Sequence, residues 1–149
     1  MGLLYINVVG LNGSGKSYLS KKLEKELGLN RIGGDEFRKF VTKNIEYFRG
    51  LETPMPYPTD RGRELNPLIH DYRLAMGILL LDIGQSVIID GSGATRKIRK
   101  TLLDTITKKG VTSVIIHCDT KDKVIEQRLS SRHSPELWKK MHHEIRKPE

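Results

Sequence analysis

The sequence has little cysteine and no long apolar run, and each shortage excludes a class of protein. Its one cysteine, Cys118, lies in the apolar run VTSVIIHC, so an internal disulfide is excluded. No apolar run approaches the roughly 20 residues that a membrane-spanning helix requires. The apolar residues 2–9 are too few for a secretory signal, and no basic region precedes them. These absences predict a cytoplasmic protein without a membrane partner, with Cys118 packed in the core.

Acidic residues are fewer than basic ones. The 149 residues contain 18 Asp and Glu against 26 Lys and Arg, which gives a formal net charge of +8. This surplus favours anionic partners, and nucleic acids, nucleotides and acidic metabolites all qualify. The length fits one domain, residues 1–149, and no internal repeat divides it.

Four short apolar runs predict strands at residues 3–9, 30–34, 86–90 and 111–118. The first, third and fourth are nearly continuous in Val, Ile and Leu, which is typical of parallel strands covered on both faces. Helical patterns occupy residues 16–27, 35–48, 65–84, 95–109, 121–132 and 135–146. This alternation predicts an α/β fold with a doubly wound parallel sheet.

One proline-rich segment interrupts the alternation. Residues 49–64 contain Pro54, Pro56 and Pro58 within a short distance. We interpret the segment as an extended loop over the carboxyl edge of the sheet, on the acceptor side, because substrates enter such folds at that edge. A plain surface connector is the alternative.

The strongest motif directly follows the first predicted strand. Gly10, four further residues and then Gly15-Lys16-Ser17 give the pattern G-x-x-x-x-G-K-S. Glycines let backbone amides approach phosphate oxygens, and the following helix adds unpaired amides and the positive end of its dipole. Lys16 can reach the β- and γ-phosphates, and Ser17 offers a hydroxyl to Mg²⁺. The predicted ATP-binding residues are Gly10, Asn12, Gly13, Ser14, Gly15, Lys16, Ser17 and Tyr18.

Asp90 ends the third predicted strand, in SVIIDGSG. A carboxylate at that place can hold Mg²⁺ directly or through water, and capping of the next turn is the alternative. Asp90 to Gly93 also spells D-x-x-G, a pattern of regulatory GTPases. The guanine-specific partner motif needs an aspartate where Lys123 stands, which disfavours the GTPase interpretation.

Asp35 and Arg38 in GGDEFRKF stand three residues apart at a predicted helix start. This spacing places both on one face near the carboxyl edge of the sheet. Asp35 can accept the proton of an attacking hydroxyl, and Arg38 can hold an anionic group of the acceptor. The alternative is a helix N-cap at Asp35 and a solvated Arg38.

Further arginines follow towards the end of the chain. Arg128 and Arg132 lie four residues apart on one helical face, where residues 128–136 predict a lid that neutralises the migrating phosphoryl group and excludes water. An ordinary basic helix face is the alternative. Arg96, shortly after Asp90, is a further candidate for substrate binding, and Arg99 a weaker one.

Together these segments resemble the small P-loop kinases, in particular the polynucleotide-kinase-like and zeta-toxin-like group. The resemblance rests on GLNGSGKS, GDEFR, VIIDGSG with Arg96 after it, and QRLSSR. It implies a three-layer α/β/α P-loop NTPase fold, with a parallel four-stranded sheet in the order 2-3-1-4 and a helical lid. It also implies that Asp35 is the general base, that Arg38 contacts the acceptor's phosphate and that Arg132 serves the transferring phosphoryl group.

These features predict an ATP- and Mg²⁺-dependent phosphotransferase that moves the γ-phosphoryl group to a hydroxyl. The favoured acceptor is a nucleic-acid 5′-hydroxyl or a nucleotide-like molecule. The first alternative is a kinase for a small metabolite such as adenylyl sulfate, a sugar or a sugar nucleotide. The second is a nucleotide-binding switch that transfers no phosphate, and a nucleic-acid-binding protein without catalysis is the least favoured.

Overall fold

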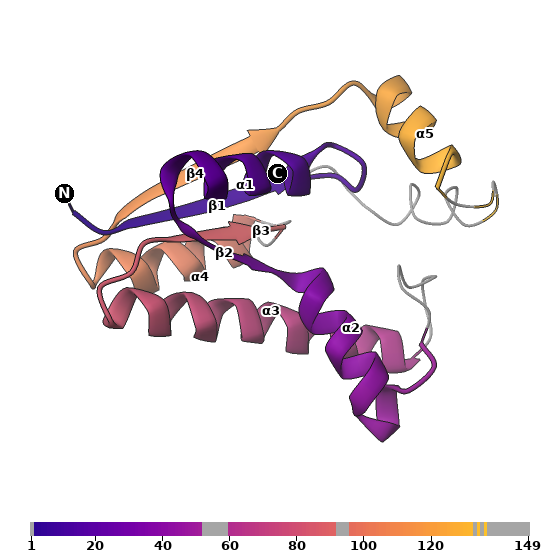
Figure 1. Ribbon diagram of the computed structural model, residues 1–149, viewed down its shortest axis with the longest axis horizontal. Helices are drawn as coiled ribbons and strands as arrows, with labels where there is room; N and C mark the ends of the chain where they lie inside the picture. Colours follow the sequence, from indigo (N-terminus) through magenta and orange to yellow (C-terminus); the bar gives the residue numbers. More distant parts are fainter. Residues whose placement is uncertain (1, 52–59, 92–95, 133, 135, 137–149) are drawn as a thin grey trace.

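A four-stranded parallel sheet forms the centre of the computed structural model, which describes residues 2–51, 60–91, 96–132, 134 and 136 (Figure 1). Its strands are β1 (Leu4–Gly10), β2 (Asn30–Gly33), β3 (Val87–Asp90) and β4 (Thr112–Cys118). They lie in the order β2-β3-β1-β4, all parallel, as the resemblance implied. Gly33 pairs with Asp90 and Gly10 with Cys118, so these residues share the carboxyl edge of the sheet.

Helices cover both faces of the sheet. They are α1 (Lys16–Leu27), α2 (Gly34–Asn44), α3 (Asp60–Asp82), α4 (Arg96–Thr107) and α5 (Asp122–Ser130), with a short 3-10 helix η1 (Glu46–Phe48). Helix α1 lies over one face, and α3 and α4 lie over the other (Figure 1). None of the helices in the described ranges has the length and hydropathy needed to cross a membrane.

Alternation along the strands divides the core between the two faces. Ile6, Val8 and Ile88 form one cluster, against which Leu19 and Leu23 of α1 pack. The other face carries a cluster of Tyr5, Ile32, Leu81, Val87, Ile89, Ile106 and Val111. Because side chains alternate between faces along each strand, these short apolar runs supply both clusters.

A smaller unit extends from the carboxyl edge. Helix α2 and the first half of α3 enclose a separate cluster of Val41, Phe48, Leu65 and Ile69. The rings of Phe37 and Tyr72 stack with centroids 3.9 Å apart and planes at 5°. This packing fixes α2 relative to α3 and therefore sets where the side chains at the start of α2 lie (Figure 1).

Two helix boundaries differ from the sequence prediction. The helix expected over 35–48 ends at Asn44, where Ile45 becomes extended and its amide donates to the carbonyl of Val41 at 2.9 Å. Helix α3 begins at Asp60, so residues 60–64 are helical and do not belong to an extended loop. Pro54, Pro56 and Pro58 and most of the helix expected over 135–146 lie outside the described residues.

The prediction that the fourth strand is covered on both faces was wrong. Val114 and Ile115 of β4 are 39% and 41% exposed, because this strand forms the edge of the sheet. Cys118 is half-buried against the α1-side cluster, so its packing role is confirmed only in part. Burial raises the pKa of the Cys118 thiol, while the Lys16 charge opposes that rise.

Candidate active site

The phosphate loop, residues 10–17, joins β1 to α1 and depends on its glycines. Gly10, Gly13 and Gly15 have φ angles of 152°, 81° and 96°, which L side chains rarely adopt. A Cβ at Gly10 would also lie 2.6 Å from Ser14 Oγ and 2.9 Å from the carbonyl oxygen of Cys118. The backbone at Gly10 therefore tolerates no side chain, and the loop closes tightly with Ser14 N–H donating to Leu11 O at 3.1 Å.

The end of β4 and helix α5 hold the loop from outside. Thr120 Oγ1 donates to the carbonyl of Ser14 at 2.8 Å, and Arg128 Nη1 donates to the carbonyl of Gly13 at 3.0 Å. A Cβ at Gly13 would lie 3.2 Å from Leu129 Cγ, so α5 packs directly on the loop. These contacts occupy loop carbonyls and fix the backbone without using its amides.

The first turn of α1 faces the loop without a side-chain cap. The N-cap residue is Gly15, and no side chain of the described residues caps the helix. The first amides of a helix have no intrahelical partner, and the positive end of the helix dipole adds to their attraction for an anion. This terminus therefore suits phosphate oxygens.

The side chain of Lys16 folds back over the phosphate loop. Its Nζ donates to the carbonyl of Leu11 at 2.7 Å. Burial lowers the pKa of Lys16, and the nearby charges of Asp90 and Asp35 oppose this shift while Arg73 adds to it. A partly buried ammonium group bonded to one neutral carbonyl gains strongly from a polyanion, so the residues present fit a phosphate chain.

Asp90 is a buried carboxylate at the carboxyl edge of the sheet, and Arg31 of β2 binds it. Arg31 Nη1 lies 2.9 Å from Asp90 Oδ2, with side chains 11% and 6% exposed. Arg31 also contacts Glu36, and its Nε lies 3.3 Å from Glu24 Oε2. Burial alone would lower the pKa of Arg31, but the hydrogen bond and charge of Glu36, with Asp90, raise it. Asp90 is therefore at the predicted place and engaged by a residue that the sequence analysis missed.

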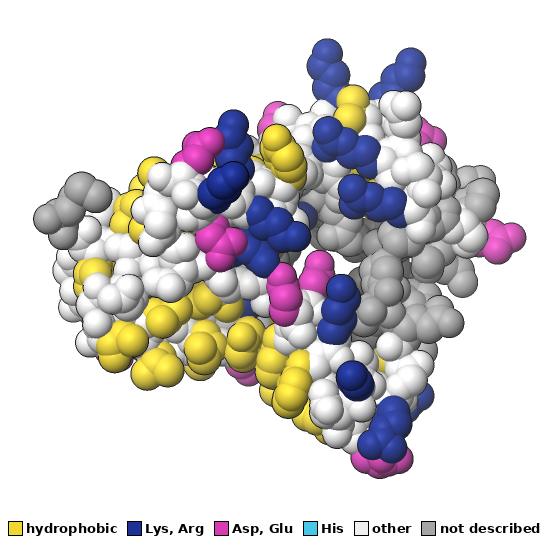
Figure 2. Space-filling view, in the orientation of Figure 1, with side chains coloured by type: hydrophobic (Ala, Val, Ile, Leu, Met, Phe, Trp, Pro, Cys, Tyr) yellow, Lys and Arg dark blue, Asp and Glu magenta, His cyan; other side chains and the backbone are white. Residues whose placement is uncertain are grey.

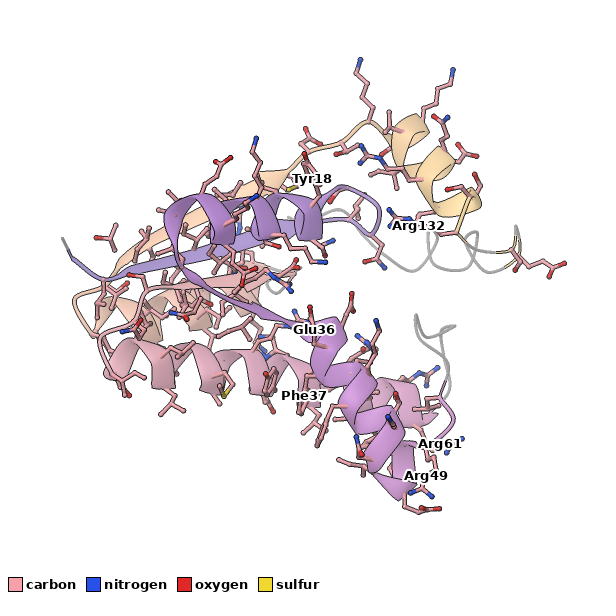
Figure 3. The ribbon with its side chains drawn as sticks, viewed as in Figure 1. Tyr18, Glu36, Phe37, Arg49, Arg61 and Arg132 are labelled. Atoms are coloured by element: carbon pink, nitrogen blue, oxygen red, sulfur yellow. The ribbon has the colours of Figure 1, made fainter. Side chains whose placement is uncertain are left out.

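The other predicted metal and nucleotide residues differ in accessibility. Ser17 is exposed in the first turn of α1, and Asn12 is exposed in the loop. Tyr18 is 76% exposed and points outward from α1 (Figure 3). Among the described residues no three His, Cys, Asp or Glu side chains group as a metal site, so a Mg²⁺ ion here would depend on Ser17, Asp90, phosphate and water.

Asp35 begins the acceptor side of the site. The N-cap of α2 is Gly33, so Asp35 is the second helical residue and does not serve as the N-cap. Its carboxylate is exposed, and its charge acts on both Lys16 and Arg73. Arg38, one turn further along, donates from Nη1 to Asn66 Oδ1 of α3 at 3.2 Å. Asp35 thus lies at the junction of the phosphate loop and the α2–α3 unit.

Arg73 of α3 is the second residue that the sequence analysis missed. A Cβ at Gly34 would overlap its guanidinium, and a Cβ at Gly91 would lie 3.9 Å from Nη1. Burial lowers the pKa of Arg73, and the charge of Arg38 lowers it further, whereas Asp90 and Asp35 oppose the shift. The sequence signal that could have identified Arg73 is its place at the start of the largely apolar run RLAMGILLLDIG.

The predicted closing arginines differ in their contacts. Arg128 contacts the phosphate loop, as described above, whereas Arg132 is exposed just beyond α5 (Figure 3). Arg96 is exposed at the start of α4, after residues 92–95, which lie outside the described part. Figure 2 shows this face hollowed between the part with α1 and α5 and the part with α2, with basic side chains above the hollow and both acidic and basic ones below.

The parallel sheet order, the phosphate loop and the basic residues around it define a P-loop fold of the kinase-like type. A family profile described as an AAA domain (AAA_33) matches residues 6–145. The chain therefore belongs to this AAA-domain family. A comparison with curated protein sequences found no significant match.

Solved structures with similar folds include several kinases. A candidate kinase of Chloroflexus aurantiacus J-10-fl is 20% identical, with a TM-score of 0.75 over 99% of this chain and 80% of that one. A sugar kinase of Janibacter sp. HTCC2649 is 22% identical, with a TM-score of 0.63 over 97% and 78%. The APS kinase of Mycobacterium tuberculosis, solved with AMPPNP and APS, is 20% identical, with a TM-score of 0.59 over 89% and 73%. At these identities the likeness concerns the fold alone.

Proposed function

We propose that the chain is an ATP- and Mg²⁺-dependent phosphotransferase that moves the γ-phosphoryl group of ATP to a hydroxyl of the acceptor. The observation that carries this proposal is the position of Asp35. The charge of its carboxylate acts on Lys16, the lysine of the phosphate loop. A base beside the end of a phosphate cradle suits the transfer of a phosphoryl group to a protonated nucleophile.

The phosphate loop would bind the triphosphate through its backbone. The uncapped amides of α1 and the loop would donate to phosphate oxygens, and Lys16 would exchange the Leu11 carbonyl for the β- and γ-phosphates. Ser17 and Asp90 would hold Mg²⁺ directly or through water, with the Asp90 carboxylate positioned by its 2.9 Å contact with Arg31 Nη1. Bound Mg²⁺ would supply charge neutralisation on the phosphates.

Asp35 would act as the general base. It is exposed, so a substrate hydroxyl can reach it, and its charge acts on both Lys16 and Arg73. The attacking hydroxyl would give its proton to this carboxylate as its oxygen bonds to the γ-phosphorus. The leaving ADP keeps the electron pair of the broken bond.

Arg128 and Arg132 would stabilise the charge that spreads over the migrating group. Arg128 already lies beside the loop at Gly13, and Arg132 follows one helical turn later. Closure of this segment over the phosphates would also exclude water, which otherwise competes as acceptor. Arg96 would contact the acceptor from the start of α4.

The favoured acceptor is a nucleic-acid 5′ end or a nucleotide-like molecule. The net charge of +8 and the position of Arg38 one helical turn after Asp35 support an anionic acceptor. The second candidate is a metabolite kinase, which the fold likeness to a sugar kinase and to an APS kinase favours. A switch that binds nucleotide without transfer is the alternative of another class.

Transfer of labelled phosphate from ATP tests the proposal, with a 5′-hydroxyl oligonucleotide and a metabolite panel as acceptors. Asp35→Asn should lower kcat by a factor of about 10² to 10⁴ and leave ATP affinity nearly unchanged, since the variant removes only the base. Asp104→Asn, exposed on α4, is the control with the same charge change and should keep full activity. Equal transfer by Asp35→Asn and wild type would overturn the assignment of Asp35 as the base. ATP binding by wild type without transfer to any acceptor would favour the switch, and labelled metabolite without labelled oligonucleotide would favour the second candidate.

A further inference from the structure

Arg73 sits between the two halves of the site. Its guanidinium lies against the backbone of Gly34 at the start of α2 and near Gly91, just after β3. Gly91 would also bring a Cβ within 3.5 Å of Lys16 Cε, so the same spot borders the phosphate-loop lysine. Arg73 therefore reaches the place where an acceptor bound at α2 meets the phosphoryl donor.

One donor of the Arg73 guanidinium, its Nε–H, is buried and receives no hydrogen-bond partner from the described residues. A buried donor without a partner destabilises a fold, and a charge in that state does so more strongly. Arg73 follows Tyr72 in α3, and the stacking of Tyr72 on Phe37 holds this part of α3 against α2.

Two other cations lie near Arg73, and both carboxylates near it have other roles. Arg38 and Lys16 each repel it, and the buried carboxylate of the edge, Asp90, is already held by Arg31. Asp35 is nearby, but the proposed reaction needs it to receive a proton. Cations gathered in this way at one small site require an anion to balance them.

We propose that Arg73 of α3 joins Arg38 in binding a phosphate or sulfate group of the acceptor, next to the hydroxyl that Asp35 deprotonates. This inference rests on the proposed function and narrows its substrate class. The acceptor is an alcohol that already carries a tetrahedral oxyanion, as a nucleotide or nucleic-acid end does, and not a neutral sugar. Planar guanidinium groups suit such oxyanions because they donate two parallel hydrogen bonds.

The position of Arg73 explains why glycine occupies position 34. Gly34 leaves room for the guanidinium, because any side chain there would displace it. A Cβ at Gly91 would make ordinary contacts with Lys16 Cε at 3.5 Å and Arg73 Nη1 at 3.9 Å, so Gly91 borders both side chains. The sequence GGD at the start of α2 thus serves the placement of an arginine from α3, and Gly34→Ala should displace that guanidinium while keeping its charge.

The test measures inorganic phosphate binding to protein that has first been saturated with Mg²⁺ and AMPPNP, so that the phosphate loop is already filled. The arginine Nε–H resonances are followed by NMR in wild type, Arg73→Met, Gly34→Ala and the control Lys39→Gln, which is exposed on α2. We expect a saturable shift of the Arg73 resonance in wild type and binding at least about tenfold weaker in Arg73→Met and Gly34→Ala. Lys39→Gln should bind phosphate as wild type does.

Thermal unfolding separates this role from a structural one. Arg73→Met keeps the apolar stem and removes a charge with an unpartnered donor, so its Tm should rise. Equal phosphate affinity in wild type and Arg73→Met, no saturable shift in wild type, or an Arg73 resonance that responds to AMPPNP but not to phosphate would each overturn the inference. Failure of AMPPNP itself to bind would instead overturn the proposed function, and the inference with it.

Discussion

Lys16 experiences two opposing effects in this fold. Burial disfavours its charged form, whereas Asp90 and Asp35 favour it, and burial is the stronger effect because the pKa is lowered from 10.5. The hydrogen bond to Leu11 O satisfies one of three ammonium donors. The side chain that gains most from ATP is thus one that weakens the fold while its charge is uncompensated.

This balance predicts how stability depends on pH at Lys16. The folded-state pKa lies below the unfolded value of 10.5, so the unfolded state binds more protons between the two values and stability there rises with pH. Lys16→Met should therefore be more stable than wild type at neutral pH, and the difference should shrink as the pH approaches 10.5. Urea unfolding of both proteins over this pH range measures it, with Lys25→Met, exposed on α1, as the control.

Arg31 gives a second prediction at the residue scale. Arg31→Met would leave the buried Asp90 carboxylate without its partner, and breaking such a pair costs about 3 kcal/mol. The free energy of unfolding, from urea denaturation, should fall by that amount. Lys109→Met removes the more exposed pair with Asp82 and should change it by less than about 1 kcal/mol. Equal losses in the two variants would show that the Arg31–Asp90 pair has no special stabilising role.

At the scale of elements, the phosphate loop depends on contacts from three directions. Strand β4 approaches Gly10 at Cys118, Thr120 binds the loop carbonyl of Ser14, and α5 packs on Gly13. The loop is therefore shaped by segments that are distant in sequence as well as by its own glycines. The contacts from Thr120 and Arg128 engage loop carbonyls and so do not compete with a ligand for the loop amides.

Gly10→Ala tests this arrangement. The added methyl would approach Ser14 Oγ and the Cys118 carbonyl closely at an unfavourable φ of 152°, so the loop must shift. We expect AMPPNP affinity to fall by at least about tenfold, measured by calorimetry, because the amides lose their alignment. Gly84→Ala, with a φ of 80° but open space around it, is the matched control and should lose only about 1 kcal/mol of stability with unchanged affinity.

At the scale of the whole molecule, local patterns predicted some features and missed others for identifiable reasons. The strand runs, the G-x-x-x-x-G-K-S loop and helix 16–27 could be read directly, because their signals are contained in consecutive residues. The exposure of Val114 depends on which strand lies at the edge, which no single run encodes. Arg31 and Arg73 reach the site only through strand register and helix packing, so residues next to them in sequence gave no indication of their partners.

The charge of the whole molecule bears on which acceptor it prefers. A net charge of +8 attracts a polyanion over a longer range than it attracts a compact metabolite, and salt weakens that attraction. Binding of a single strand weakens with salt in proportion to the number of phosphates that the protein neutralises. A nucleic-acid acceptor should therefore show a salt dependence that a mononucleotide acceptor lacks.

We expect KM for a 5′-hydroxyl oligonucleotide to rise about tenfold when the salt concentration rises about fourfold, if about two to three phosphates are neutralised. KM for a nucleoside 3′-phosphate should change far less, since only the group bound by Arg38 and Arg73 is then involved. Steady-state transfer assays at several salt concentrations, with ATP saturating, measure both. Parallel salt dependence of the two acceptors would mean that recognition stops at the first phosphate, and the positive charge beyond the site would then have no part in binding the substrate.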